Sequence, residues 1–254
     1  RFLFRSRSRT FTLMPLKLLT LNIEQDRHLD RVAQTIATHL PDIVCLQEVF
    51  EKDCAKLAAV GGYQVKYAIS TLMPEGTAGN TSPRSWGVAV LTRVQLINQT
   101  VAYYSDDPRI RIFDAPNDLR RMVVMTELQH EGRFYRFGTT HFTWSMAGAT
   151  TEEQLADFAR LKRVLLPYSD YVLCGDFNAP RGGDLFARFT DELGLIDHLP
   201  PNVTTTIDPQ FHYAGALELA VDTIFSTPEY SVTDVQVLEG ISDHKGILAR
   251  VARP

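Results

Sequence analysis

Short apolar runs that end in a polar or acidic residue recur along the chain, and they limit it to a fold with several buried strands. Runs of this length between turn residues are typical of strands in the interior of a sheet. Each such strand also carries a polar side chain to its end. The clearest cases are Leu18–Leu21 before Asn22, Ile43–Leu46 before Gln47 and Glu48, Phe134–Thr140 before His141, and Val172–Gly175 before Asp176.

Helices and strands alternate early in the chain, whereas pairs of strands crowd its middle and end. Residues 27–40 repeat apolar side chains at helical spacing, and Thr151 to Gln154 form a capping-box sequence that opens a helix to about residue 166. Two further helices are expected at 51–60 and 184–193. Strands are expected at 18–22, 42–47, 86–92, 121–129, 134–140, 171–175, 220–225, 232–238 and 246–251, with long loops at 70–85 and 104–119.

This order predicts α/β layers with two mixed, mostly antiparallel sheets packed together, rather than a parallel doubly wound sheet. With 254 residues, 44% of them hydrophobic, the chain can bury a core of normal size. We expect a single domain over residues 14–254. Residues 1–13 hold four arginines and no acid, and are interpreted as a non-native or disordered extension, with organellar targeting as the alternative.

The charge balance argues against a protein that resides on DNA. The chain has 30 acidic and 26 basic residues, and four of the basic ones lie in the first 13 residues. Non-specific duplex binding usually needs a basic face. No apolar run approaches 18 residues, so no transmembrane segment is expected. Cys45 and Cys174 lie in apolar runs, which favours buried thiols in a reducing compartment, and we expect a cytoplasmic monomer.

Asp176 and Asn178 form the sharpest local pattern. An offset of two residues at a strand end points both side chains the same way. A carboxylate there can orient a water molecule, and a neutral amide can bind a phosphate oxygen without repelling it. The alternative is an ordinary polar turn, since Gly-Asp-x-Asn is turn-like.

The other strand-end residues allow similar alternatives. Glu48 could be an acid at a helix start, favoured by the helix dipole, and Asn22 a simple turn residue. His244 beside Asp243 could act on a proton or stabilise a charged transition state, with Asp222 holding its ring, or the pair could be a surface turn. His141 could donate to a phosphate oxygen or be a satisfied strand-end histidine.

Carboxylates gathered at one rim would repel each other, and a hard cation held by oxygen ligands relieves that repulsion. The oxygen-rich set favours Mg²⁺, with Mn²⁺ as a substitute. Other chemistries fit less well, because the sequence lacks a Gly-x-Ser-x-Gly elbow, a phosphate-binding P-loop and a His-Glu-x-x-His zinc motif.

Six of these motifs, in order, resemble the endonuclease/exonuclease/phosphatase superfamily. They are Leu-Asn-Ile (Asn22), Leu-Gln-Glu-Val (Glu48), Thr-His-Phe (His141), Gly-Asp-Phe-Asn (Asp176, Asn178), Val-Asp-Thr-Ile-Phe (Asp222) and Ser-Asp-His (Asp243, His244). The resemblance implies a DNase I-like, four-layered α/β sandwich of two sheets flanked by helices. It also implies a metal-dependent phosphoric ester hydrolase, in which an activated water attacks phosphorus in line.

The resemblance assigns roles residue by residue. Glu48 would be the main metal ligand, with Asn22, Glu24 and Asp243 close by. Asp176 would position or deprotonate the water, Asn178 and His141 would hold the phosphate, and His244, paired with Asp222, would stabilise the pentacovalent state. Many relatives have Asp where this chain has Glu24, which leaves the number of metal ions open.

The substrate is less constrained than the reaction. We expect a phosphodiester, with the ends of nucleic acids, as in DNA repair endonucleases or tyrosyl-DNA phosphodiesterases, as the first hypothesis. A sphingomyelinase-like or other lipid or small-molecule phosphoesterase is the alternative, and an inactive binding module of the same fold is a remote one. Candidate substrate contacts are Arg84, Arg120, Arg121, Arg181, Trp86 and Trp144, which could equally be surface or core residues.

Overall fold

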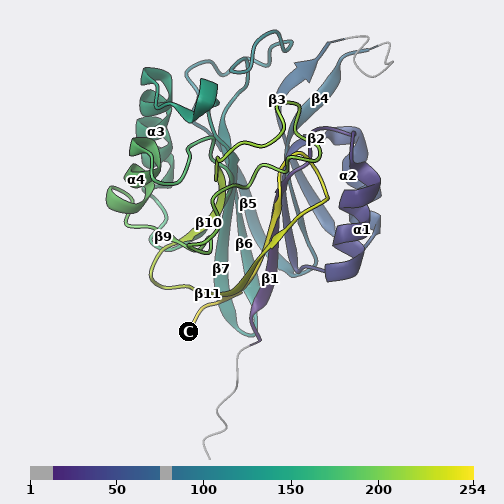
Figure 1. Cartoon of the computed structure of the whole chain (residues 1–254). Coiled ribbons are helices and arrows are strands. Elements are labelled where there is room, and N and C mark those ends of the chain that lie inside the picture. Colours follow the sequence, from purple (N-terminus) through teal and green to yellow (C-terminus); the bar gives the residue numbers. More distant parts are fainter. Residues whose placement is uncertain (1–13, 75–81) are drawn as a thin grey trace, which may run out of the picture.

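The computed structural model describes residues 14–74 and 82–254 (Figure 1). The predictions for residues 1–13 and for the middle of the 70–85 loop therefore lie outside the described residues. Two six-stranded sheets pack face to face, and each is covered on its outer face by a pair of helices. This is the predicted four-layered α/β sandwich.

The first sheet combines strands from both ends of the chain. Its order is β11-β12-β1-β2-β4-β3, and within it only β1 and β2 run parallel. Helices α1 (Leu29–His39) and α2 (Glu51–Ala59) cover its outer face. The strands are β1 (Leu16–Asn22), β2 (Ile43–Phe50), β3 (Gln64–Met73), β4 (Arg84–Thr92), β11 (Ser231–Leu238) and β12 (Gly246–Ala252).

The second sheet is built from the middle of the chain. Its order is β5-β6-β7-β8-β10-β9, and within it only β7 and β8 run parallel. Helices α3 (Glu152–Leu165) and α4 (Asp184–Asp191) cover it, and a short 3₁₀ helix, η2 (Met146–Gly148), precedes α3. The strands are β5 (Gln95–Tyr103), β6 (Met122–His130), β7 (Arg133–His141), β8 (Val172–Asp176), β9 (Ile196–Asp197) and β10 (Asp222–Ser226).

Three apolar clusters correspond to the three contacts between layers. The middle one joins the sheets through side chains such as Leu18, Val90, Phe137 and Ile224, and the outer two lie under the helix pairs. Each such buried side chain stabilises the fold by about 1.5–3 kcal/mol. Gln47 is a polar exception, whose Nε2 donates to Thr139 Oγ1 of the other sheet at 3.0 Å.

The predicted capping box is confirmed at the start of α3. Thr151 and Gln154 exchange hydrogen bonds between side chain and backbone, which satisfies amide groups that the first helical turn leaves free. The Gln154 side chain also donates to the backbone oxygens of Thr143 and Asn178 at 2.8 and 3.0 Å. The helix start thus anchors two loops beside the strand ends.

Several predicted boundaries were wrong. No strand was expected at β3, β5 or the short β9, and the predicted 70–85 loop includes the end of β3 and the start of β4. All three missed strands lie at sheet edges, where many residues are exposed and the apolar pattern is weak. The first helix begins at Leu29 rather than residue 27, and β2 continues to Phe50. No helix in the described ranges is long and apolar enough to cross a membrane.

Candidate active site

The strand ends that carry the candidate residues meet at one end of the sandwich. In the second sheet, Asp176 of β8 lies opposite His141 of β7 on one side and opposite Asp222 of β10 on the other. In the first sheet, Asn22 ends β1 opposite Gln47, next to Glu48. Asp243 and His244 come just before β12, which pairs with β1.

Glu48 owes its position to an irregularity in β2. The register of β2 against β4 shifts between Leu46 and Val49, and Glu48 adopts a positive φ of 59°. A bulge of this kind re-aims a side chain that regular alternation would direct elsewhere. The carboxylate consequently lies among the other candidate groups.

Asn22 joins the two sheets through its amide. Its Nδ2 donates to Glu48 Oε1 at 3.0 Å and to Asp176 Oδ2 at 3.1 Å. Burial and the charge of Asp243 nevertheless raise the pKa of Glu48 to about 7. Burial and the neighbouring Asp222 also raise the pKa of Asp176. The bridging amide therefore does not offset the repulsion between these buried carboxylates.

His141 faces the same carboxylates. Its Nε2 lies 3.6 Å from Asp176 Oδ2 and 3.8 Å from Glu48 Oε1. Burial lowers the pKa of His141 to about 3, against the opposing attraction of Asp176. The ring is therefore a neutral imidazole near pH 7, able to donate one hydrogen bond to a ligand oxygen.

His244 has the opposite electrostatic character. Its Nδ1 lies 2.8 Å from Asp222 Oδ2, and its Nε2 lies 4.0 Å from Asp176 Oδ2. Burial disfavours its charge, but Asp222 and Asp176 outweigh that effect and raise the pKa of His244 well above its usual value. Thr206 Oγ1 also donates to Asp222 Oδ2 at 2.6 Å, which fixes the carboxylate that orients the ring.

The turn after β8 directs Asn178 toward the same place. Asn178 has a positive φ of 48°, and its backbone amide donates to Asp176 Oδ1 at 2.9 Å. Its Nδ2 donates to the backbone oxygen of Phe142 at 3.0 Å. Gly175 lies beside Thr140 so closely that a Cβ there would be 2.0 Å from the Thr140 oxygen, so only glycine fits.

Glu24 and Asp243 complete the group on the side of the first sheet. The Glu24 carboxylate pairs with Arg27 and with His28 Nε2, the latter at 3.1 Å. Burial first and Asp243 second raise the pKa of Glu24. Ser242 Oγ donates to Asp243 at 3.0 Å. The pairing of Glu24 with Arg27 and His28 distinguishes it from Glu48.

Two sets of side chains could hold a metal ion. Ligand atoms of Asp176, Asp222 and His244 lie within 4.8 Å of one another. However, His244 Nδ1 and Asp222 Oδ2 already bond each other. The second set, Glu48 with Asp243 and Asn22, is rich in oxygen, and Asp243 contributes to the raised pKa of Glu48. A divalent cation would relieve that repulsion, so we consider this set the better fit.

Comparison with known proteins identifies the family. A family model described as the Endonuclease/Exonuclease/phosphatase family matches residues 19–244. The chain belongs to this family. No curated protein matches it significantly.

Solved structures of low identity share the fold of this family member. A family protein from Leptotrichia buccalis is 21% identical, with a TM-score of 0.72 over 93% of this chain and 99% of that one. The human nocturnin catalytic domain is 18% identical, with a TM-score of 0.69 over 95% and 94%. A mannosyl-6-phosphatase from Bacteroides thetaiotaomicron is 17% identical, with a TM-score of 0.65 over 93% and 99%. At such identities the likeness concerns the fold alone.

In this member of the family, the candidate residues line a cleft of about 700 Å³. Asn22 and Asp222 lie behind them, fully buried. Trp86 and Trp144 also line the cleft. Sequence reasoning missed most of the remaining lining, which comes from loops and the short η2 helix, where no periodic pattern marks it. Those residues include Phe113, Leu119, Ser145, Met146, Ile207, Tyr213, Leu217 and Leu219.

Arg84 and Arg120, both expected to contact the substrate, are not among the residues that line this cleft. Arg84 Nη1 donates to Asp26 at 2.9 Å, and its guanidinium lies 3.7 Å from the centre of the Phe50 ring. Arg120 Nη2 donates to the backbone oxygen of Ile69 at 2.8 Å. Both side chains are thus used within the fold.

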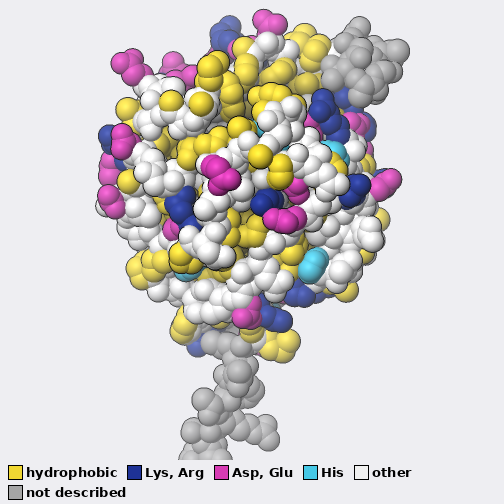
Figure 2. All heavy atoms as spheres, in the orientation of Figure 1, with side chains coloured by type: hydrophobic (Ala, Val, Ile, Leu, Met, Phe, Trp, Pro, Cys, Tyr) yellow, Lys and Arg dark blue, Asp and Glu magenta, His cyan; other side chains and the backbone are white. Residues whose placement is uncertain are grey.

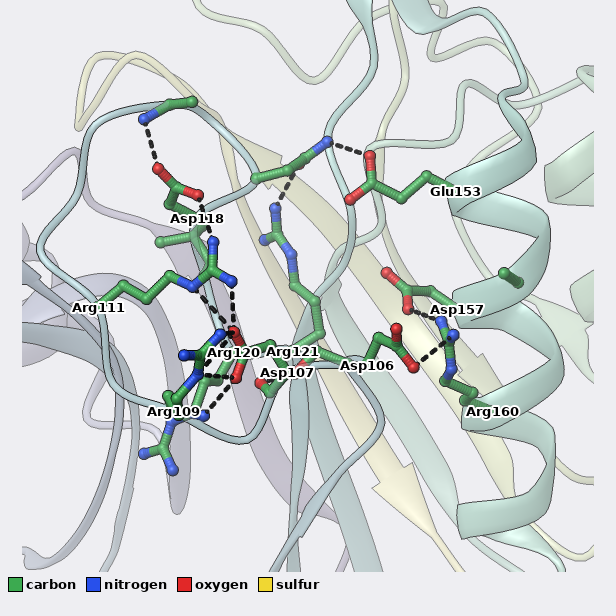
Figure 3. A pocket seen from close by; sticks show the side chains of 15 residues that line it. Asp106, Asp107, Arg109, Arg111, Asp118, Arg120, Arg121, Glu153, Asp157 and Arg160 are labelled. Carbon is green, nitrogen blue, oxygen red and sulfur yellow. Dashed lines mark hydrogen bonds and ion pairs between the residues drawn. The ribbon is translucent and has the colours of Figure 1, made fainter.

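A second pocket, of about 480 Å³, lies between the β5–β6 loop and α3 (Figure 3). Three of its five arginines pair with acids of the same pocket, as Figure 3 shows. Arg109 and Arg111 pair with Asp107, and Arg160 pairs with Asp106 and Asp157. Arg121, a further sequence candidate, is buried here and donates to the backbone oxygen of His141 at 3.2 Å. Arg181 pairs with Asp197 elsewhere.

Proposed function

We propose that this protein is a divalent-metal-dependent phosphoesterase that hydrolyses a phosphodiester by attack of an activated water on phosphorus. The observation that carries the proposal is the buried triad formed by Asp176, His244 and Asp222, with Asn22 bridging Asp176 to Glu48. It combines one charged imidazole, one neutral imidazole and several carboxylates in a single cleft. Such a set can manage the charge that develops on a phosphate during displacement.

Each residue then has a defined task. Asp176 orients the water and accepts its proton as the new oxygen–phosphorus bond forms. The bond from phosphorus to the leaving oxygen breaks, and that oxygen takes a proton from solvent to leave as the alcohol. The neutral His141 and the Asn178 amide hold non-bridging phosphate oxygens. The charged His244, fixed by Asp222, stabilises the negative charge that accumulates on phosphorus.

Glu48, Asn22 and Asp243 would hold Mg²⁺, or Mn²⁺ as a substitute, with Glu24 close by. When bound there, the cation supplies the positive charge that the carboxylates lack and assists the attack of water. Because Glu24 already pairs with Arg27 and His28, we propose that it plays a smaller part than Glu48.

A panel of phosphodiesters tests the proposal. Bis-p-nitrophenyl phosphate, 5′-tyrosyl DNA, abasic duplex and sphingomyelin are each incubated with Mg²⁺, Mn²⁺ or EDTA. We expect turnover of at least one ester with metal, and its loss with EDTA and in Asp176→Asn. Binding without turnover of any substrate would favour the inactive binding module instead.

The substrate class has two candidates at this level. Nucleic-acid ends were the first hypothesis from sequence, and lipid or small-molecule esters were the alternative. The apolar lining of the cleft, including Trp86, Phe113 and Leu217, favours the alternative. A cytoplasmic location and a monomeric state remain predictions.

A further inference from the structure

The described residues that line the cleft offer no lysine or arginine for a second phosphate. Instead, the lining includes the acidic side chains of Glu24, Glu48, Asp176, Glu218 and Asp243. A nucleic acid carries a negative charge on every nucleotide, and proteins bind it with Lys and Arg along the backbone. This lining is therefore poorly suited to an extended polynucleotide.

The arginines of the second pocket are already bonded within the protein: Arg120 and Arg121 donate to backbone oxygens, and the other three pair with acids. In the second pocket, Arg109, Arg111 and Arg160 all pair with aspartates at separations of 3.4 Å or less. That pocket is lined by equal numbers of arginines and acids (Figure 3). A phosphate would have to displace these acids before it could bind.

Apolar side chains begin directly at the catalytic imidazole. The Trp86 ring lies edge-on to His141, with centroids 6.3 Å apart, and edge-on to Phe113 at 5.5 Å. The lining continues through Leu119, Trp144 and the segment 207–221. Met146 and Tyr213, also in the lining, are 75% and 88% exposed. Figure 2 shows hydrophobic side chains gathered at the upper end of the molecule, where Figure 1 places the β5–β6 loop and the β3–β4 hairpin.

Two polar atoms in this lining have no hydrogen-bond partner among the described residues. They are Trp86 Nε1 and Ser145 Oγ, and their residues are only 5% and 6% exposed. Native proteins rarely leave such buried groups unpaired, because each one is destabilising. Because less than 1 Å² of either atom is exposed, a ligand oxygen satisfies them once the side chains turn toward the cleft.

We infer that the substrate carries a single phosphate esterified to an apolar or aromatic group, which lies against Trp86, Phe113 and Trp144. Trp86 Nε1 and Ser145 Oγ donate to oxygens of this ester. The inference rests on the proposed phosphoesterase function and specifies its substrate. A phosphate ester dissolved in water and one embedded in a lipid surface would both fit this description of the substrate.

A series of p-nitrophenyl phosphodiesters tests the inference. The leaving group stays constant, and the second ester group is methyl, hexyl, phenyl, thymidine or an oligonucleotide. We expect kcat/KM to rise from methyl to hexyl by at least about tenfold, since each buried methylene contributes up to about fourfold. We expect the oligonucleotide ester to be no better than the thymidine ester.

Substitutions in the cleft lining test which residues recognise the second ester group. Trp144→Ala should lower kcat/KM for the hexyl and phenyl esters at least about fivefold. Trp86→Phe keeps an aromatic ring but removes Nε1, and Ser145→Ala removes Oγ. Each of these single variants should lower kcat/KM about two- to tenfold, the contribution of one hydrogen bond. Phe134→Ala removes an exposed aromatic ring of β7 outside the cleft and serves as the matched control. Circular dichroism and melting temperature verify that each variant is folded.

The outcomes separate the two proposals. If no ester is hydrolysed with any metal, the phosphoesterase function fails. If the esters are hydrolysed but the second group and the variants leave kcat/KM unchanged, or the oligonucleotide ester is preferred in a salt-dependent manner, the inference on the substrate fails. Comparing a short-chain phospholipid in solution with the same headgroup in vesicles tells a dissolved substrate from a lipid surface.

Discussion

His244 donates a hydrogen bond through Nδ1 to Asp222 Oδ2 at 2.8 Å, while its Nε2 is directed toward Asp176, 4.0 Å away. One ring nitrogen is thus fixed by a carboxylate outside the cleft lining, and the other faces the candidate reaction centre. The two carboxylates together raise the pKa of His244. The relationship defines both the orientation and the charge of the ring.

Asp222→Asn should therefore lower kcat by about 10²- to 10⁴-fold, the usual range for a group that supports acid–base or charge-stabilising chemistry. The amide keeps the size of the side chain but removes the charge that holds His244 protonated. Steady-state kinetics on bis-p-nitrophenyl phosphate measure the effect. Asp184→Asn, at the start of α4, is the matched control and should leave kcat unchanged. A kcat within tenfold of wild type would show that Asp222 is dispensable.

The bridge that Asn22 makes between Glu48 and Asp176 predicts a stability effect as well as a loss of activity. Asn22→Ala leaves two buried carboxylates without their shared donor. We expect the free energy of unfolding without metal to fall by about 1–3 kcal/mol. Urea denaturation measures it. Unchanged stability and activity together would contradict the bridging role.

Gly175→Ala should destabilise the protein strongly, by about 3 kcal/mol or more, because its Cβ would lie 2.0 Å from the Thr140 backbone oxygen. Gly194 offers a matched control, since it has a positive φ of 65° but open space around it. Gly194→Ala should cost only about 1 kcal/mol. Thermal unfolding of both variants compares the two effects. Equal losses would mean that the close approach at Gly175 is easily relieved.

Divalent metal should raise the melting temperature of the protein, because a ligand that binds only the folded state stabilises it. The shift should depend on Glu48. Glu48→Gln should abolish it, whereas Glu51→Gln, an exposed change at the start of α2, should retain it. Scanning fluorimetry with Mg²⁺, Mn²⁺ and EDTA provides the measurement. A shift that survives in Glu48→Gln would place the metal elsewhere, with the Asp176, Asp222 and His244 set as the next candidate.

The layers of the fold could be predicted from sequence because interior strands are nearly continuous apolar runs. Strands β3 and β5 could not, because edge strands leave many side chains exposed. The strand ends indicated the candidate residues, and the structure brings them together. The charges of His141 and His244 could not be predicted, because they depend on burial and on partners distant in sequence: burial lowers the pKa of His141, whereas Asp222 outweighs burial and raises the pKa of His244.

The cleft lining was beyond prediction for a different reason. Phe113, Ser145 and Leu219 lie in loops, where no periodicity indicates which side chain turns inward. Arg84 illustrates the same limit, because the sequence does not reveal that its guanidinium will bond Asp26 and stack on Phe50.

The order of the strands has a consequence for how the site comes into being. The second sheet is one uninterrupted stretch of chain, inserted between the two parts that make the first sheet. Asn22 and His244, near opposite ends of the described chain, can meet Asp176 only after β12 has paired with β1 and both sheets have packed. A partly folded chain therefore cannot assemble part of the site. Enzymatic activity would appear only when the whole sandwich has folded.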